Sequence, residues 1–130
     1  MKTIVRRLTA GRDLKTEIEK IIAQEKVEAG IVLSSVGCVS AARFRLADGR
    51  SIKSMEEPLE ILSVNGTLSR NGCHLHVTYG DTTGRAWGGH LTEGNIVNTT
   101  CELVIGIVES KRFNREYDET TGYKELLIKE

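Results

Sequence analysis

Residues 72–91 read GCHLHVTYGDTTGRAWGGHL and hold all three histidines of the chain. In a β-strand, successive side chains point to opposite faces of the sheet. His74 and His76 therefore share one face, while the apolar side chains of Leu75 and Val77 share the other. The alternation predicts a strand with a polar, histidine-bearing face and an apolar face that packs on a core.

The middle of this stretch has the composition of a turn. Residues 80–84 read GDTTG, so the chain is predicted to return antiparallel and form a β-hairpin. We expect Gly80 to lie opposite Gly84. This register places His90 opposite His74, on one face and with Cβ atoms about 5 Å apart. The glycine pair before His90 leaves an alternative open, because a bulge there would turn its imidazole away.

Three converging histidines form a metal-binding pattern. Neutral imidazole is a common ligand of transition metals, and three imidazoles with an open fourth position suit Zn²⁺ or a similar ion. The sequence predicts a metal site at His74, His76 and His90, with a divalent transition metal, zinc before others, as the cofactor. The alternative is a hydrogen-bonded set of histidines on a sheet face. The sequence identifies no catalytic residue.

The flanking segments predict the rest of the fold. Residues 4–8 are predicted to form a first strand, and Asp13 is predicted to cap a helix with apolar residues on one side. Further strands are predicted at residues 29–37, 39–46, 59–68, 99–109 and 125–128. The pattern favours an α/β (α+β) fold, a mainly antiparallel sheet with one principal helix packed on it.

Three consecutive predicted strands give the sheet two distinct faces. An Arg-Asn-Gly turn at residues 70–72 leads into the histidine strand, with Asn71 and Gly72 as its central residues and Leu68 opposite Leu75. The expected apolar face holds Leu62, Val64, Leu68, Leu75, Val77, Tyr79 and Trp87. The expected polar face holds Thr67, Ser69 and Thr78 with the three histidines.

Length and charge limit the possible classes of function. The 130 residues fit a single domain, residues 1–130, and the 18 Lys and Arg balance the 18 Asp and Glu. This balance gives no general electrostatic attraction to nucleic acid or to an anionic membrane. No apolar run could span a bilayer, and the N-terminus lacks a signal-peptide core, so we expect a cytoplasmic protein.

The remaining polar candidates are weaker. Cys38, Cys73 and Cys101 lack C-x-x-C spacing and are expected to be buried thiols rather than disulfide partners or zinc ligands. Glu60 and Glu102 lie within apolar strands, where they are either exposed at a rim or available as a base. A polar stretch with Arg112, Arg115 and Asp118 is expected to be a solvated loop, or else an anion or subunit contact.

The order of these motifs resembles a known family. Gly37, LEILSVNG at 59–66, HLH at 74–76 and GGHL at 88–91 are similar to the PPC domain (plants and prokaryotes conserved, also called DUF296), over nearly the whole chain. The resemblance implies a homotrimer, and in some prokaryotic relatives the three histidines form a metal site.

The same resemblance bears on DNA. Plant relatives carry AT-hook segments, whose Gly-Arg-Pro core grips the minor groove. The single proline here, Pro58, lies between Glu57 and Leu59 and makes no such core. We therefore expect a stand-alone prokaryotic type of PPC protein without a hook, in which direct DNA binding is weak or indirect.

Two classes of function follow from these features. In the first, the protein is a homotrimeric interaction or regulatory module, DNA-associated through partners, and its three-histidine metal is structural or vestigial. In the second, it is a metal-dependent enzyme or a protein that binds a small-molecule ligand at an open coordination position on zinc. The sequence does not decide whether the protein is an enzyme.

Overall fold

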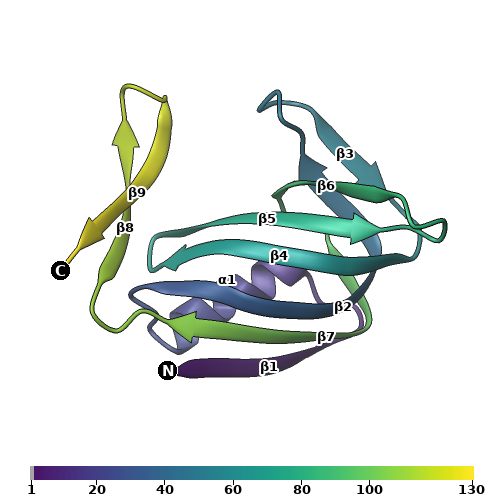
Figure 1. Cartoon of the computed structure of the whole chain (residues 1–130), viewed down its shortest axis with the longest axis horizontal. Coiled ribbons are helices and arrows are strands. Elements are labelled where there is room, and N and C mark those ends of the chain that lie inside the picture. The colour runs from purple at the N-terminus through teal and green to yellow at the C-terminus, as the bar shows by residue number, and fades with distance from the viewer. Residues whose placement is uncertain (1) are drawn as a thin grey trace.

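The computed structural model describes residues 2–130 (Figure 1). Its elements are β1 (Thr3–Thr9), α1 (Leu14–Gln24), β2 (Gly30–Arg45), β3 (Ile52–Met55), β4 (Leu59–Ser69), β5 (Gly72–Gly80), β6 (Ala86–Leu91), β7 (Ile96–Ile107), β8 (Arg112–Asp118) and β9 (Tyr123–Lys129). The predicted mainly antiparallel sheet with a single principal helix is confirmed. No helix among the described residues is long and apolar enough to cross a membrane.

Seven strands form one sheet, in the order β1-β7-β2-β4-β5-β6, with β3 paired to β2. The long strand β2 also pairs with β6 at its C-terminal end, where Arg45 lies opposite His90. Because β2 pairs both with its neighbour β4 and with the edge strand β6, the sheet curves between these strands. Strands β8 and β9 form a separate two-stranded hairpin that stands to one side of the main sheet (Figure 1).

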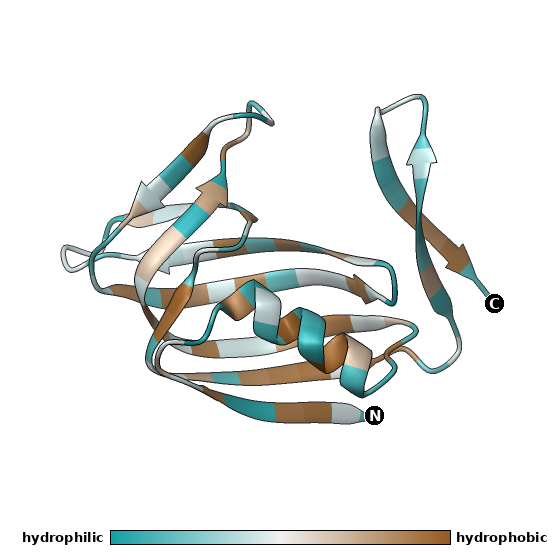
Figure 2. Ribbon diagram, turned by 180° about the vertical axis from the view of Figure 1, so that it is seen from behind, coloured by the Kyte–Doolittle hydropathy of each residue, from teal (hydrophilic) through white to brown (hydrophobic). Residues whose placement is uncertain are grey.

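Helix α1 covers one face of the sheet (Figure 2). Asp13 caps it as predicted, accepting a hydrogen bond of 3.0 Å from the backbone N–H of Thr16. The residues that the helix buries are Leu14, Ile18, Ile21 and Ile22. They pack with the inward side chains of the sheet in a single apolar core. His74 and His76 lie on the opposite, exposed face of the sheet.

One long strand replaces two predicted ones. The strands predicted at residues 29–37 and 39–46 merge into the continuous strand β2 (Gly30–Arg45). Its register against β7 shifts between Gly37 and Cys38. A Cβ at Gly37 would lie 2.1 Å from the carbonyl oxygen of Thr100. The glycine therefore marks a close approach of the backbones of β2 and β7 rather than the end of a strand.

The sequence prediction is wrong on the inward side of β4. Leu62, expected on the apolar face, is 58% exposed, whereas Ile61 is 6% exposed and lies in the core. A register shift between Ile61 and Ser63 inserts an extra residue and reverses the alternation. From Val64 onward, the predicted apolar side is buried as expected.

Two strands have no clear sequence signal. β3 has four residues and pairs only with β2. β8 runs through the polar stretch that was expected to be a loop, and it pairs only with β9. Because little of either strand is buried, neither carries the apolar alternation that predicts a strand.

Candidate metal centre

The histidine hairpin forms as predicted, but its register differs by two residues. His90 lies opposite His76 rather than His74, and Gly80 pairs with Ala86 rather than Gly84. The cause is a turn displaced by one residue along the chain. The N–H of Asp81 donates to the carbonyl oxygen of Arg85, so Asp81 and Arg85 close the turn in place of Gly80 and Gly84. A two-residue shift keeps every side chain on its own face, so the three histidines still converge.

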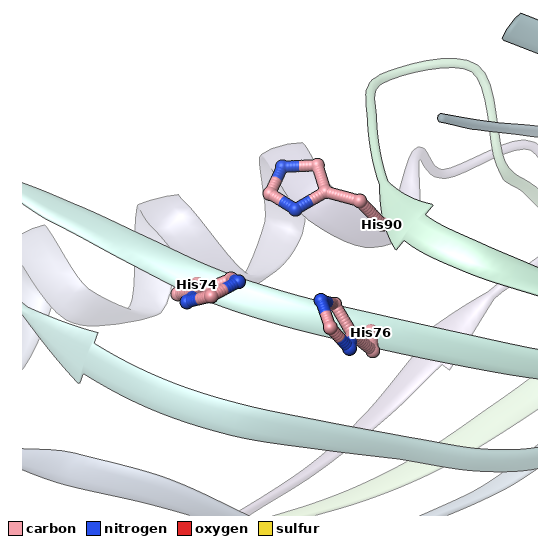
Figure 3. A group of neighbouring side chains, drawn as sticks. All are labelled: His74, His76 and His90. Atoms are coloured by element: carbon pink, nitrogen blue, oxygen red, sulfur yellow. The ribbon is translucent and has the colours of Figure 1, made fainter. Parts of the chain in front are cut away.

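The imidazoles lie side by side on three neighbouring positions of β5 and β6 (Figure 3). Ring centroids are 5.0 Å apart for His74 and His76, 5.4 Å for His74 and His90, and 5.9 Å for His76 and His90. One ligand nitrogen from each residue lies within 4.8 Å of the other two. The three histidines can therefore hold a metal ion.

Gly88 and Gly89 serve strand packing, and no bulge occurs there. The pairing of β5 with β6 runs without a shift from Gly80 to His76, so the alternative that turns His90 away does not apply. A Cβ at Gly88 would lie 2.4 Å from the carbonyl oxygen of Val77, and one at Gly89 would lie 2.3 Å from that of Arg45. The absence of these side chains lets β6 approach both β5 and β2.

The surroundings of His74 and His90 favour the neutral imidazole that a metal requires. Burial, followed by the positive charge of Arg45, lowers the pKa of His90 to about 4. Burial, followed by His76 and Arg115, lowers the pKa of His74. Neutral rings have a free lone pair at neutral pH, so the electrostatics agree with metal binding.

An orphaned nitrogen provides an independent test of the fit. Nδ1 of His90 is buried and has no hydrogen-bond partner among the described residues. Buried polar side-chain atoms are nearly always paired, so such an atom needs an explanation. A metal ion on the histidine face would supply the missing partner, and the donor set of three imidazoles is one that zinc uses.

Strand β4 pairs with the histidine strand β5 along the edge opposite to β6. Thr67 lies opposite His74, on the histidine face as predicted, but Leu68 lies opposite Cys73 rather than Leu75. The turn explains this difference, since Ser69 pairs with Gly72 and leaves Arg70 and Asn71 as the central residues. The shift is again of two residues, so the assignment of faces survives.

The histidines line a cavity of about 660 Å³. Its other lining residues come from the end of β2 and its following loop, from the β4–β5 turn, from the glycine pair of β6 and from the C-terminal hairpin. They are Arg45, Leu46, Ala47, Gly49, Asn71, Gly72, Cys73, Gly88, Gly89, Arg115, Tyr123, Lys124 and Glu125. The site is thus a pocket beside a histidine cluster and not a flat sheet face.

Several sequence candidates lie away from this cavity. Glu60 and Glu102 are exposed and do not line it, which fits rim exposure. Of the three candidates in the polar stretch, Arg115 lines the cavity whereas Arg112 and Asp118 do not. Tyr123 and Lys124 also line the cavity, and no local sequence pattern predicts this, because the C-terminal hairpin is far from the histidines in the sequence.

The thiols differ from the expectation in part. Cys101 is fully buried, as predicted, but Cys38 and Cys73 are only half-buried. All three are free. Cys73 lines the cavity, where burial raises the pKa of its thiol, and it does not belong to the group of potential metal ligands.

Known proteins are similar to this chain in sequence and in fold. Over 122 residues, the chain is 46% identical to the bifunctional protein GlmU of two Synechococcus strains, covering 94% of this chain and 19% or 20% of the relatives. The chain thus spans about a fifth of the length of these curated relatives. A hypothetical protein from Salmonella enterica has the same fold with a TM-score of 0.94 at 31% identity, covering 98% of this chain and 92% of that one.

Two more solved structures are informative. A metal-containing protein from Archaeoglobus fulgidus matches with a TM-score of 0.82 at 30% identity, over 98% of this chain and 94% of that one. A Bacteroides thetaiotaomicron protein, provisionally named as DNA-binding, matches with a TM-score of 0.85 at 21% identity, over 96% and 91%, and this likeness shows the fold alone. The model of one family covers residues 1–109. This chain belongs to the Plants and Prokaryotes Conserved (PCC) domain family.

Proposed function

We propose that this protein is a homotrimeric interaction or regulatory module whose three histidines bind a divalent transition metal, zinc before others. The observation that carries the metal site is the convergence of three ligand nitrogens within 4.8 Å of one another on the face that also holds the orphaned His90 Nδ1. The metal-containing relative from Archaeoglobus fulgidus supports this proposal.

His74, His76 and His90 would hold the ion, and their β-sheet framework would fix the spacing of the rings. An ion bound by three imidazoles supplies a Lewis-acid position that is open to a further ligand. The chain's own contribution is to favour the neutral form of His74 and His90 and to surround the histidines with a cavity rather than with bulk solvent.

The proposal of a trimer rests on apolar side chains of the sheet that are exposed to solvent in the single chain. Val5 is 62% exposed, Val36 is 57% exposed and Leu62 is 58% exposed. Val5 alternates with the buried Ile4, so it points away from the face that α1 covers. Exposed apolar residues from β1, β2 and β4 are suited to burial against other copies of the chain.

A module role also agrees with the size of the matched segment in the curated relatives. This segment makes up about a fifth of the bifunctional protein GlmU, so the same domain occurs there within a much longer chain. We therefore favour a role in which the domain serves other proteins or domains, with any association to DNA made through partners.

One observation favours the second candidate, a metal-dependent enzyme or small-ligand-binding protein. The cavity beside the histidines has the volume of a small-molecule site. Glu125 is the one carboxylate among its lining residues, so few residues of the cavity could act as a general acid or base. Ligand binding at the metal is thus better supported than catalysis.

Elemental analysis of protein purified without an affinity tag tests the metal site. We expect one transition-metal ion per chain in the wild type, and loss of the ion in His74→Ala, His76→Ala and His90→Ala. Glu60→Ala is the control, since this exposed residue does not line the cavity. Full occupancy in any of the three histidine variants would refute the shared site.

A further inference from the structure

The cavity beside the histidines has a strongly cationic lining. Arg45, Arg115 and Lys124 line it, against the single carboxylate of Glu125. None of the three cationic side chains forms an ion pair with a described residue. This excess of positive charge contrasts with the overall charge of the chain, which is zero.

Two of these cations are incompletely satisfied. The Nε atoms of Arg45 and Arg115 are buried and have no hydrogen-bond partner among the described residues. A buried guanidinium N–H without an acceptor is costly, and a protein seldom keeps two beside one cavity without a partner for them. The wall of the cavity thus holds two guanidinium groups whose donors are not all taken up by the protein, and this suits a ligand with acceptor oxygens.

The fold holds both arginines in place. Arg45 ends β2 and lies opposite His90 in the β2–β6 pairing. Arg115 donates from an Nη atom to Oγ1 of Thr67 at 2.5 Å, and its backbone N–H donates to Oδ1 of Asn71 at 3.0 Å. Asn71 in turn donates to the carbonyl oxygen of Arg115 at 3.1 Å, so the C-terminal hairpin is tied to the β4–β5 turn.

The hairpin also lies outside the part of the chain that the family model matches, which ends at residue 109. Arg115 and Lys124 both belong to it. The histidines and Arg45 therefore come from the matched domain, while the other two cations come from a segment beyond it. This division allows the cavity to recognise a ligand through residues that the family match does not include.

We propose that this cavity binds a small organic anion, whose carboxylate or phosphate group is held by the guanidiniums of Arg45 and Arg115. Guanidinium offers a planar fork of donors that matches the oxygens of either group, which a point charge such as lysine does less well. The inference deepens the proposed metal site, since the three histidines line the same cavity and would place their ion beside the anion.

Calorimetric titration with two probes, malonate and inorganic phosphate, tests the proposal and separates the two chemical sources. Each probe is titrated into metal-loaded protein and into metal-free protein. We expect at least one probe to bind, with an affinity about tenfold or more weaker in Arg45→Met and in Arg115→Met. Arg112→Met is the matched control, because Arg112 lies on the same strand, is exposed and does not line the cavity.

The metal content of each variant separates this inference from the proposed function. Arginine variants that keep the ion but lose the anion support the inference. Anion binding to metal-free protein that depends on the arginines supports it too, and this outcome is independent of whether the histidines bind an ion. Wild-type protein that binds neither probe, or binds one with the same affinity in both arginine variants, overturns it. The variants Arg45→Lys and Arg115→Lys guard against misfolding, and we expect them to weaken binding less than methionine does.

Discussion

His76 and His90 lie directly opposite each other in adjacent antiparallel strands, with ring centroids 5.9 Å apart. This pairing makes the geometry of the proposed metal site depend on the register of one hairpin. A slip of one residue would move His90 to the other face of the sheet. The features that fix the register, above all the loop between β5 and β6, are therefore as important to the site as the histidines.

Replacing Asp81 is expected to loosen this loop. Its carboxylate accepts hydrogen bonds from the backbone N–H groups of Thr83 and Arg85 and from Nε1 of Trp87. These bonds hold the pKa of Asp81 well below its usual range. In Asp81→Ala, we expect a lower melting temperature and a red shift of the fluorescence of Trp87, the single tryptophan.

Asp48→Ala serves as the control for this variant. Asp48 makes similar bonds to the backbone N–H groups of Arg50 and Ser51, but in the loop between β2 and β3. It should change the fluorescence of Trp87 little. An equal red shift in both variants would contradict a specific role of Asp81 in the histidine hairpin.

The pH dependence of the metal-free protein should reflect His90. Its pKa is lowered to about 4 in the folded protein, against about 6.5 in an unfolded chain. The unfolded state therefore takes up a proton first as the pH falls, and the free energy of unfolding decreases between about pH 6.5 and pH 4. Titration of the His90 ring by NMR checks the cause, since an ordinary pKa near 6.5 would contradict it.

The same shift sets the sign of the effect on metal binding. Protons compete with the metal only for imidazoles that they can occupy, so a lowered pKa at His74 and His90 delays this competition to lower pH. In metal-free His90→Ala, we expect the free energy of unfolding to decrease less with falling pH than in the wild type, because the imidazole with the lowered pKa is absent. The unfolding of this variant, measured across the same pH range, is the matched comparison.

Gly66 supports the histidine strand through its backbone, and its substitution is expected to be severe. Its φ is +148°, and a Cβ there would lie 1.8 Å from the carbonyl oxygen of His74. Gly66→Ala must push β4 away from β5, so we expect a loss of about 2 kcal/mol or more in the free energy of unfolding. Gly84→Ala is the control. Its φ of +83° is also unfavourable for alanine, but nothing lies within 4 Å of the new methyl group, so about 1 kcal/mol is expected.

These positions show what the sequence could and could not predict. The convergence of the three histidines followed from the two-residue period of strands, and it survived the register error between β5 and β6 because that shift was of two residues. The error between β4 and β5 was also of two residues, so Thr67 stayed on the histidine face. The error at Leu62 came from an odd shift at a bulge, which leaves no mark in composition. Arg115 and Lys124 join the cavity through contacts between distant segments, and no local pattern indicates such contacts.

The proposed homotrimer makes a direct prediction for mass in solution. Light scattering coupled to gel filtration should give three times the mass of the chain at micromolar concentration. Val36→Asp places a charge on the exposed apolar face and should shift the mass toward that of the monomer. Ile52→Asp, on the short strand β3, should leave the mass unchanged. A monomer in the wild type would contradict the proposal.

DNA binding is expected to be weak and insensitive to sequence. The 18 basic residues are balanced by 18 acidic ones, so few counterions can be released when the protein meets a duplex. Arg45 and Arg115, which form no ion pair with a described residue, line a cavity with the volume of a small-molecule site. Fluorescence anisotropy at physiological salt, with AT-rich and GC-rich duplexes of equal length, should give similar and weak affinities that fall as salt is added. Tight binding that prefers the AT-rich duplex would show that assembly gathers basic side chains on one face, and would contradict an association with DNA made only through partners.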